Sequence, residues 1–156
     1  MEPFAQKHEL AKQLGATHTY TQADEALDFV KEYTWGIGAD SAILTPSLID
    51  AELVRNAVNV IGKGGTVVVV ALSNPNKATI QLSSADLSLY EKTITGTIFG
   101  SGNPHRDIIK LIEMWKTGAI QLEPLINGRF SLEQINEGYD KLLAGDVIRG
   151  LIEHEH

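Results

Sequence analysis

Cysteine is absent from the 156-residue sequence, which excludes disulfides and thiolate metal centres. A zinc ion bound by this chain would therefore need the five histidines or the carboxylates as ligands. The absence of cysteine also fits a reducing compartment, where proteins do not rely on disulfides. We therefore expect a cytoplasmic protein.

Basic residues are outnumbered, with 13 Lys and Arg against 20 Asp and Glu, so the formal net charge is −7. Such a chain repels the phosphates of nucleic acids, and no cluster of basic residues is dense enough to overcome this locally. Long apolar runs are also lacking, since no stretch approaches the roughly 20 apolar residues that span a bilayer. Residues 1–4 show no signal-peptide pattern. We expect neither nucleic acid nor a membrane as a partner.

The sequence does contain a regular alternation of helical and strand patterns. The expected elements are helices over 6–14, 23–33 and 49–61 and strands over 16–20, 40–44 and 66–72. Four consecutive valines, at 67–70, leave no face for solvent, which is typical of a central parallel strand between two helix layers. The alternation predicts an α/β fold with a doubly wound, Rossmann-like parallel sheet.

The second half continues the alternation with shorter elements. We expect strands over 78–82 and 93–99, a helix over 104–117, and a final strand, helix and strand over 125–130, 132–143 and 150–154. The helix over 104–117 should bury one apolar stripe, formed by Ile108, Leu111, Ile112 and Trp115. No repeat or linker divides the chain, so residues 1–156 are expected to form one Rossmann-like domain. The strand, glycine-rich turn and helix that open such a domain have no counterpart in this sequence.

Several motifs occur together in a characteristic order. They are LGAT at 14–17, GAD at 38–40, GG at 64–65, GTIFG at 96–100, GAIQLEPLI at 118–126, FSLEQINEG at 130–138 and AGDVIR at 144–149. In order and spacing the chain, from about residue 2 to residue 154, resembles the zinc-type medium-chain alcohol dehydrogenases. The resemblance is to their nucleotide-binding portion, and residues 125–156 resemble the segment that returns to the catalytic domain. It implies that the first strand, the glycine-rich loop and the catalytic domain lie outside this chain.

The resemblance implies an NAD-binding site. Glu2 and Lys7 fall on the positions that bind the adenosine ribose, and a carboxylate there favours NAD because it would repel the 2′-phosphate of NADP. The alternative is a frayed terminal charge at Glu2 and a solvated helix residue at Lys7. Thr45 would lie beside the adenine.

The same resemblance implies the contacts of the nicotinamide. Val70, Ala71 and Leu72 would contact its carboxamide through their main chain, and Thr97 and Phe99 would lie beside the ring. The alternative, which the side chains alone favour, is that all five are plain strand core.

Arg149 matches the arginine that reaches the cofactor pyrophosphate in this family, a task suited to a permanently charged, forked donor. The alternative is a surface arginine that caps the preceding helix.

Catalytic and metal-binding residues are not expected in this chain. The family's zinc ligands belong to the upstream catalytic domain, so zinc is expected only there, and we expect the isolated chain to be inactive and to bind NAD weakly or not at all. The resemblance further implies a homodimer through an edge strand at 79–82 and an interface with the catalytic domain.

The leading hypothesis is thus the cofactor-binding part of an NAD-dependent oxidoreductase that transfers hydride between an alcohol and NAD. One alternative is a zinc-independent quinone or enoyl reductase of the same superfamily. Another is a non-catalytic folded remnant that acts as an interaction domain.

Overall fold

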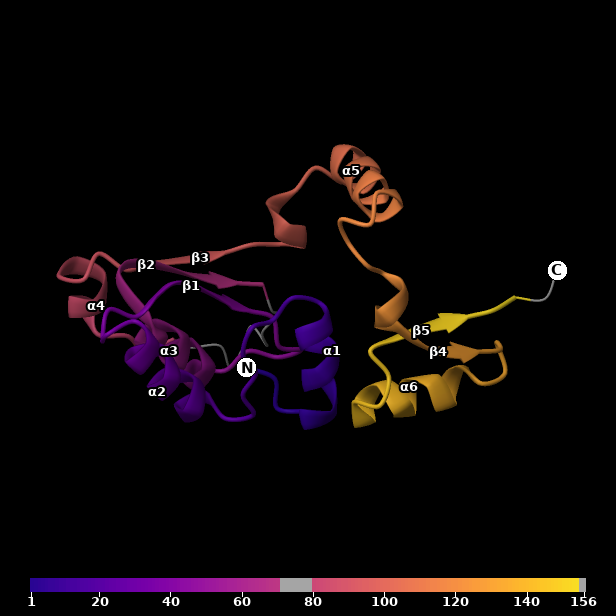
Figure 1. Cartoon of the computed structure of the whole chain (residues 1–156), viewed down its shortest axis with the longest axis horizontal. Coiled ribbons are helices and arrows are strands. Elements are labelled where there is room, and N and C mark those ends of the chain that lie inside the picture. Colours follow the sequence, from indigo (N-terminus) through magenta and orange to yellow (C-terminus); the bar gives the residue numbers. More distant parts are fainter. Residues whose placement is uncertain (71–79, 155–156) are drawn as a thin grey trace. The chain divides into compact units, whose positions relative to one another are not determined.

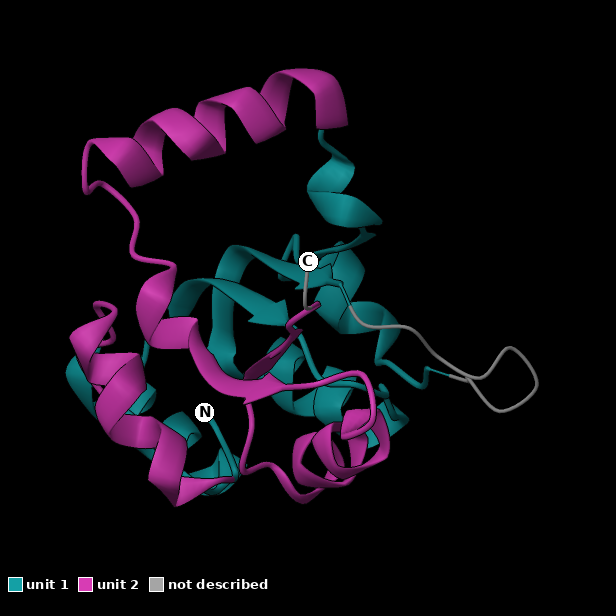
Figure 2. Cartoon of the chain, turned by 90° about the vertical axis from the view of Figure 1, so that its right-hand side faces the viewer, with its two compact units in different colours: residues 1–3, 19–102 teal, residues 4–18, 103–156 magenta. Residues whose placement is uncertain are grey.

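The computed structural model describes residues 1–70 and 80–154, which its contacts divide into two units (Figure 2). The first unit comprises residues 1–3 and 19–102, and the second comprises residues 4–18 and 103–156. Among the residues described, no helix combines the length and the apolarity that crossing a bilayer requires.

The first unit is built on a three-stranded parallel sheet with the order β1-β2-β3 (Figure 1). Its elements are α2 (Ala23–Tyr33), β1 (Ala39–Leu44), α3 (Ala51–Val60), β2 (Ile61–Val69), α4 (Ser84–Ser88), β3 (Thr93–Gly96) and the 3-10 turn η2 (Phe99–Ser101). Helix α3 packs on β1 and β2, and α2 packs on α3. The predicted order of helix, strand, helix and strand over residues 23–70, with a central strand at the valine run, is confirmed.

The core of the first unit lies between α3 and the sheet. Asp50 starts α3 by accepting a 2.8 Å hydrogen bond from the amide of Leu53, which satisfies one of the free amides of the first turn. The helix then buries an apolar stripe that includes Val54 and Val58 against Val67 of β2. The side chain of Val67 is fully buried at the centre of this contact.

The opposite face of the sheet differs from the expectation that β2 is covered on both sides. On this face Ile43 of β1 pairs in register with Val68 of β2, and Ile43 is 66% exposed. Helix α3, the crossover between β1 and β2, packs on the other face of these strands, and α2 packs on α3. Helices α2 and α3 therefore leave the face of Ile43 and Val68 uncovered within this unit.

Three predicted strands need correction. Residues 16–20 form no strand, because the two backbone bonds described there, from the amide of Ala16 to the carbonyl of Ala11 and from the amide of Glu2 to the carbonyl of Tyr20, each at 2.9 Å, make no ladder. Residues 80–82 also form none, since a strand requires a ladder partner, and residues 78 and 79 lie outside the described part. The strand predicted over 93–99 ends at Gly96, because Phe99 has a left-handed φ of 49°.

The second unit contains a strand-helix-strand motif. Its elements are η1 (Ala5–Lys7), α1 (His8–Gln13), α5 (Pro104–Lys116), η3 (Glu123–Leu125), β4 (Ile126–Phe130), α6 (Ile135–Ala144) and β5 (Arg149–Ile152). Strands β4 and β5 are parallel, and α6 contacts both. The final strand, helix and strand predicted from the sequence are confirmed.

The apolar stripe of α5 is not buried, contrary to expectation. Ile108 is 56% exposed and Trp115 is 42% exposed, and α5 has no buried residue. The helical period is correct, but no other described element of the second unit packs extensively against this face. An amphipathic pattern shows which face is able to pack, whereas burial requires an element to pack against.

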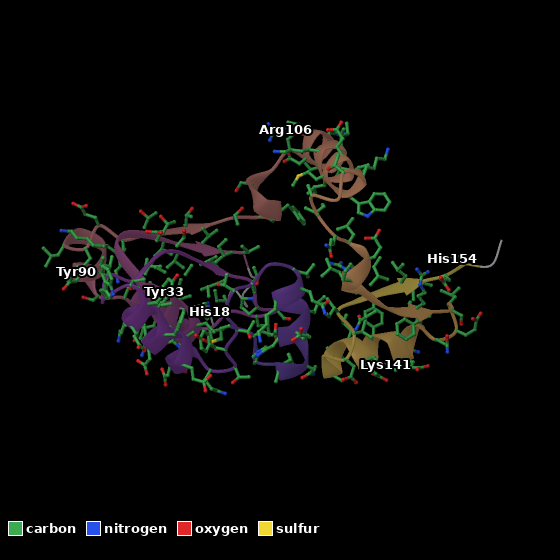
Figure 3. All side chains as sticks on the ribbon, in the orientation of Figure 1. His18, Tyr33, Tyr90, Arg106, Lys141 and His154 are labelled. Atoms are coloured by element: carbon green, nitrogen blue, oxygen red, sulfur yellow. The ribbon has the colours of Figure 1, made fainter. Side chains whose placement is uncertain are left out.

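Phe130 forms the centre of the second unit. It is 6% exposed, and its ring is within reach of Gly128, Gly138 and Gly150. A Cβ atom built on Gly128 would lie 2.7 Å from Cε2 of the ring. Lys141 of α6, marked in Figure 3, places its ammonium 5.6 Å from the ring centroid. The glycines thus allow the backbone of β4, α6 and β5 to approach the aromatic ring closely.

Candidate cofactor-binding site

The register of the first sheet brings three predicted site residues to one edge. Leu44, Val69 and Gly96 are paired in register across β1, β2 and β3. The next residues along the chain are Thr45, Val70 and Thr97, so all three lie at the carboxyl edge of the sheet. The amide of Val70 donates to the carbonyl of Leu44, and that of Thr97 donates to Val69, each at 3.0 Å. Ligands of open α/β sheets bind at this edge.

The groups at this edge are neutral and polar. Thr45 is exposed, Val70 is 36% exposed and Thr97 is half-buried. The hydroxyls of Thr97 and Ser101 lie 2.7 Å apart, which is hydrogen-bond distance. Main-chain amides, carbonyls and hydroxyls of this kind both donate and accept hydrogen bonds, as a carboxamide ligand requires.

A left-handed turn follows Thr97. Phe99, Gly100 and Ser101 have φ angles of 49°, 66° and 54°, and the amide of Ser101 donates to the carbonyl of Ile98 at 2.9 Å. Left-handed backbone is costly for residues other than glycine, and such strain is found most often at functional sites. The turn leaves the side chain of Phe99 89% exposed. Sequence reasoning missed Ser101; the only signal was a hydroxyl four residues after Thr97.

The remaining predicted site residues divide between the units. Glu2 belongs to the first unit, where its amide bonds to Tyr20. Lys7 and Arg149 belong to the second unit. The ammonium of Lys7 lies 4.6 Å from the ring centroid of Phe4, a cation–π contact. Two further predicted contacts, Ala71 and Leu72, lie outside the described residues.

Arg149 opens β5 and is exposed. It lines an apolar groove of about 280 Å³ formed by residues of β4, α6 and β5. Arg149 is the only charged side chain in this lining, so the groove could accept an anionic group at one point of an otherwise apolar surface.

Zinc does not fit the residues that the structure describes. No three histidine or acidic side chains in that part of the chain come close enough together to hold a metal ion, and the sequence has no cysteine. Any zinc chemistry would therefore depend on ligands outside these residues.

Comparison with known proteins relates this geometry to one family. The family model for zinc-binding dehydrogenases matches residues 1–117. The chain is 48% identical over 154 residues to the NDMA-dependent alcohol dehydrogenase of Amycolatopsis methanolica, covering 99% of this chain and 42% of that protein. It is 40% identical over 154 residues to alcohol dehydrogenase B of Mycobacterium tuberculosis, covering 99% and 41%. The chain thus spans about 42% of the length of the first of these relatives.

Solved structures support the same relationship. Benzyl alcohol dehydrogenase from Acinetobacter calcoaceticus superposes with a TM-score of 0.83 at 30% identity, over 94% of this chain and 40% of that chain. An alcohol dehydrogenase zinc-binding domain protein from Burkholderia ambifaria gives a TM-score of 0.89 at 24% identity, over 99% and 41%, which shows the fold alone. The predicted α/β fold class and the resemblance are both confirmed, and the chain belongs to the zinc-binding dehydrogenase family.

Proposed function

We propose that this chain is the cofactor-binding part of an oxidoreductase that transfers hydride between an alcohol and NAD. The observation that carries the proposal is the alignment of Thr45, Val70 and Thr97 at the carboxyl edge of a parallel sheet. Membership of the zinc-binding dehydrogenase family supports the reaction class. The chain itself supplies binding and orientation, since we assign no catalytic residue to it.

The nicotinamide end of NAD would bind at the sheet edge. The amides of Val70 and Thr97 already donate within the sheet, so their main-chain carbonyls would accept from the amide of the carboxamide, and the main chain of Phe99 would complete the contact. NAD supplies the hydride acceptor when it is bound. Fixing the ring on a strand edge limits its rotation, which favours transfer from one face.

The resemblance assigns the remaining predicted residues to the other end of the cofactor. The carboxylate of Glu2 would accept hydrogen bonds from the ribose diol, with Lys7 assisting and Thr45 beside the adenine. Arg149 would neutralise the pyrophosphate. Because a carboxylate repels a 2′-phosphate, this set of residues favours NAD over NADP.

Calorimetric titration of the chain with NAD tests the proposal. We expect weak but saturable binding of NAD, still weaker binding of NADP, and a further loss of about tenfold to a hundredfold in affinity for Arg149→Ala. Arg106→Ala is the matched control, because Arg106 is exposed on α5 and pairs with the neighbouring Asp107. Saturable binding that Arg149→Ala weakens and Arg106→Ala does not would support the proposal. No binding at millimolar NAD would overturn it and favour a non-catalytic folded remnant.

A homodimer and a cytoplasmic location complete the proposal. The resemblance suggests pairing through residues 79–82, and the exposure of Ile80, at 49%, supports a covered position in an assembly. Light scattering on the wild-type chain and Ile80→Asp would test the dimer, which the charge should dissociate. A monomeric wild-type chain would contradict it. The absence of cysteine supports the cytoplasmic location.

A further inference from the structure

An extra residue interrupts the pairing of β4 with β5. Ile126 pairs with Arg149, and the next pair is Gly128 with Gly150, so β4 advances by two residues while β5 advances by one. Asn127 is the additional residue, and the irregularity has the form of a β-bulge. Bulges are enriched beside functional sites, where they redirect a side chain.

The side chain of Asn127 holds the turn that leads into β5. Its Nδ2 donates to the carbonyl of Asp146 at 2.9 Å, and its Oδ1 accepts from the amide of Ile148 at 2.8 Å. Only one orientation of the carboxamide satisfies both bonds, because a flipped amide would place a donor against a donor and an acceptor against an acceptor. The two bonds therefore define how this side chain is oriented.

Arg149 follows this turn directly. The amides of Asp146 and Val147 donate to the carbonyl of Lys141, which ties the start of the turn to the end of α6. Asn127 holds the residues on either side of Val147, and the ladder with Ile126 holds Arg149 itself. Hydrogen bonds to α6, to the bulge and to the neighbouring strand β4 thus restrain the backbone of Arg149.

We propose that Asn127 is a positioning residue for the pyrophosphate site, acting through Arg149. The inference rests on the proposed function, in which Arg149 binds the pyrophosphate of NAD. A long arginine side chain loses conformational entropy when it binds a ligand. If the backbone of the arginine is already restrained, the backbone part of that entropy cost is smaller. Asn127 does not contact the cofactor in this proposal.

Two substitutions at position 127 remove the two hydrogen bonds to different extents. Asn127→Ala removes both of them. Asn127→Asp keeps an acceptor for the amide of Ile148 but places a second acceptor against the carbonyl of Asp146. Asn136→Ala is the matched control, because Asn136 is an exposed asparagine on α6 of the same unit.

The test is a double-mutant cycle for NAD binding, with wild type, Asn127→Ala, Arg149→Ala and the double variant. We expect Asn127→Ala to weaken NAD binding by roughly tenfold and Asn136→Ala to leave it unchanged. In the Arg149→Ala background, Asn127→Ala should have no further effect. Additive losses, or an unchanged affinity in Asn127→Ala, would overturn the inference while leaving the proposed function intact.

Hydrogen exchange gives a readout that needs no cofactor. The amide of Ile148 should exchange roughly tenfold faster in Asn127→Ala than in wild type, and unchanged exchange would overturn the inference. If Asn127→Ala does not fold, Asn127→Asp replaces it, with a loss of NAD affinity that again disappears in the Arg149→Ala background. If the wild-type chain binds no NAD, the proposed function fails and the inference fails with it.

Discussion

The ammonium of Lys92 donates a 2.7 Å hydrogen bond to the main-chain carbonyl of Val58 in the last turn of α3. The same group lies 3.6 Å from a carboxylate oxygen of Asp86, and Tyr90, marked in Figure 3, places its ring centroid 5.8 Å away. Only 9% of the Lys92 side chain is exposed. A sheltered cation at the carbonyl end of a helix stabilises the terminal carbonyls and the negative end of the helix dipole.

Lys92→Met should therefore lower the free energy of unfolding by about 1–3 kcal/mol, because it leaves a carbonyl and a carboxylate without their cation. Urea unfolding followed by circular dichroism measures the change. Lys63→Met is the control, since Lys63 is exposed on β2 of the same unit and should change stability little. Equal effects of the two substitutions would contradict the role of Lys92.

Ser101 contributes a hydrogen bond but occupies left-handed backbone. Ser101→Ala should cost about 1 kcal/mol, because it removes the bond to Thr97 and keeps the strained φ. Ser101→Gly removes the same bond but relieves about 1 kcal/mol of strain, so it should be close to neutral. Thermal unfolding of both variants measures the difference. Equal stabilities of the glycine and alanine variants would show that the left-handed backbone at position 101 carries no strain.

Gly128 has no room for a side chain. Gly128→Ala would place its Cβ 2.7 Å from the Phe130 ring and 3.2 Å from Val147, so we expect a loss of about 1–3 kcal/mol in unfolding free energy. Gly96→Ala is the control on β3, where a Cβ would meet nothing within 4 Å. Chemical denaturation compares the two. A stability of Gly128→Ala equal to that of Gly96→Ala would show that the ring moves aside freely.

Trp115 and Glu123 form a pH-sensitive pair. The indole Nε1 donates to Oε1 of Glu123 at 2.7 Å. The amide of Glu123 itself and then this bond hold the pKa of the carboxyl below its ordinary value. Since the folded pKa is lowered, the contribution of the bond is present above the ordinary glutamate pKa and is lost as pH falls through the folded value.

The fluorescence of Trp115 should report this transition in a Trp35→Phe background, which leaves one tryptophan. We expect the emission to change with a midpoint below the ordinary glutamate pKa, and Glu123→Gln should abolish the change. A midpoint above the ordinary value would mean that the hydrogen bond is not formed in solution.

Local patterns predicted much of the fold, and non-local pairing accounts for the errors. The helix predicted over 23–33 has those bounds as α2, because its period and acidic first turn lie within the segment and a glycine turn at 36–38 follows it closely. The prediction of a strand over 16–20 was wrong, because a strand depends on a partner strand distant in sequence. The prediction that α5 buries its apolar stripe was wrong for a related reason. The spacing of apolar residues does not show which other element packs against that face of the helix.

The candidate site was predictable only in part. Thr45, Val70 and Thr97 could be assigned to one edge because the carboxyl ends of neighbouring parallel strands come together. Asn127 and Ser101 could not, because their hydrogen bonds depend on a bulge and on a left-handed turn. Neither feature has a local sequence pattern strong enough to predict it.

The close packing of glycines around Phe130 has an evolutionary consequence. Each added methyl at position 128, 138 or 150 would meet the same ring, so a change at any of the three requires Phe130 to shift. A smaller side chain at 130 would release all three positions at once. Among homologues we therefore expect these four positions to vary together, with alanine at the glycine positions accompanying the loss of the aromatic ring.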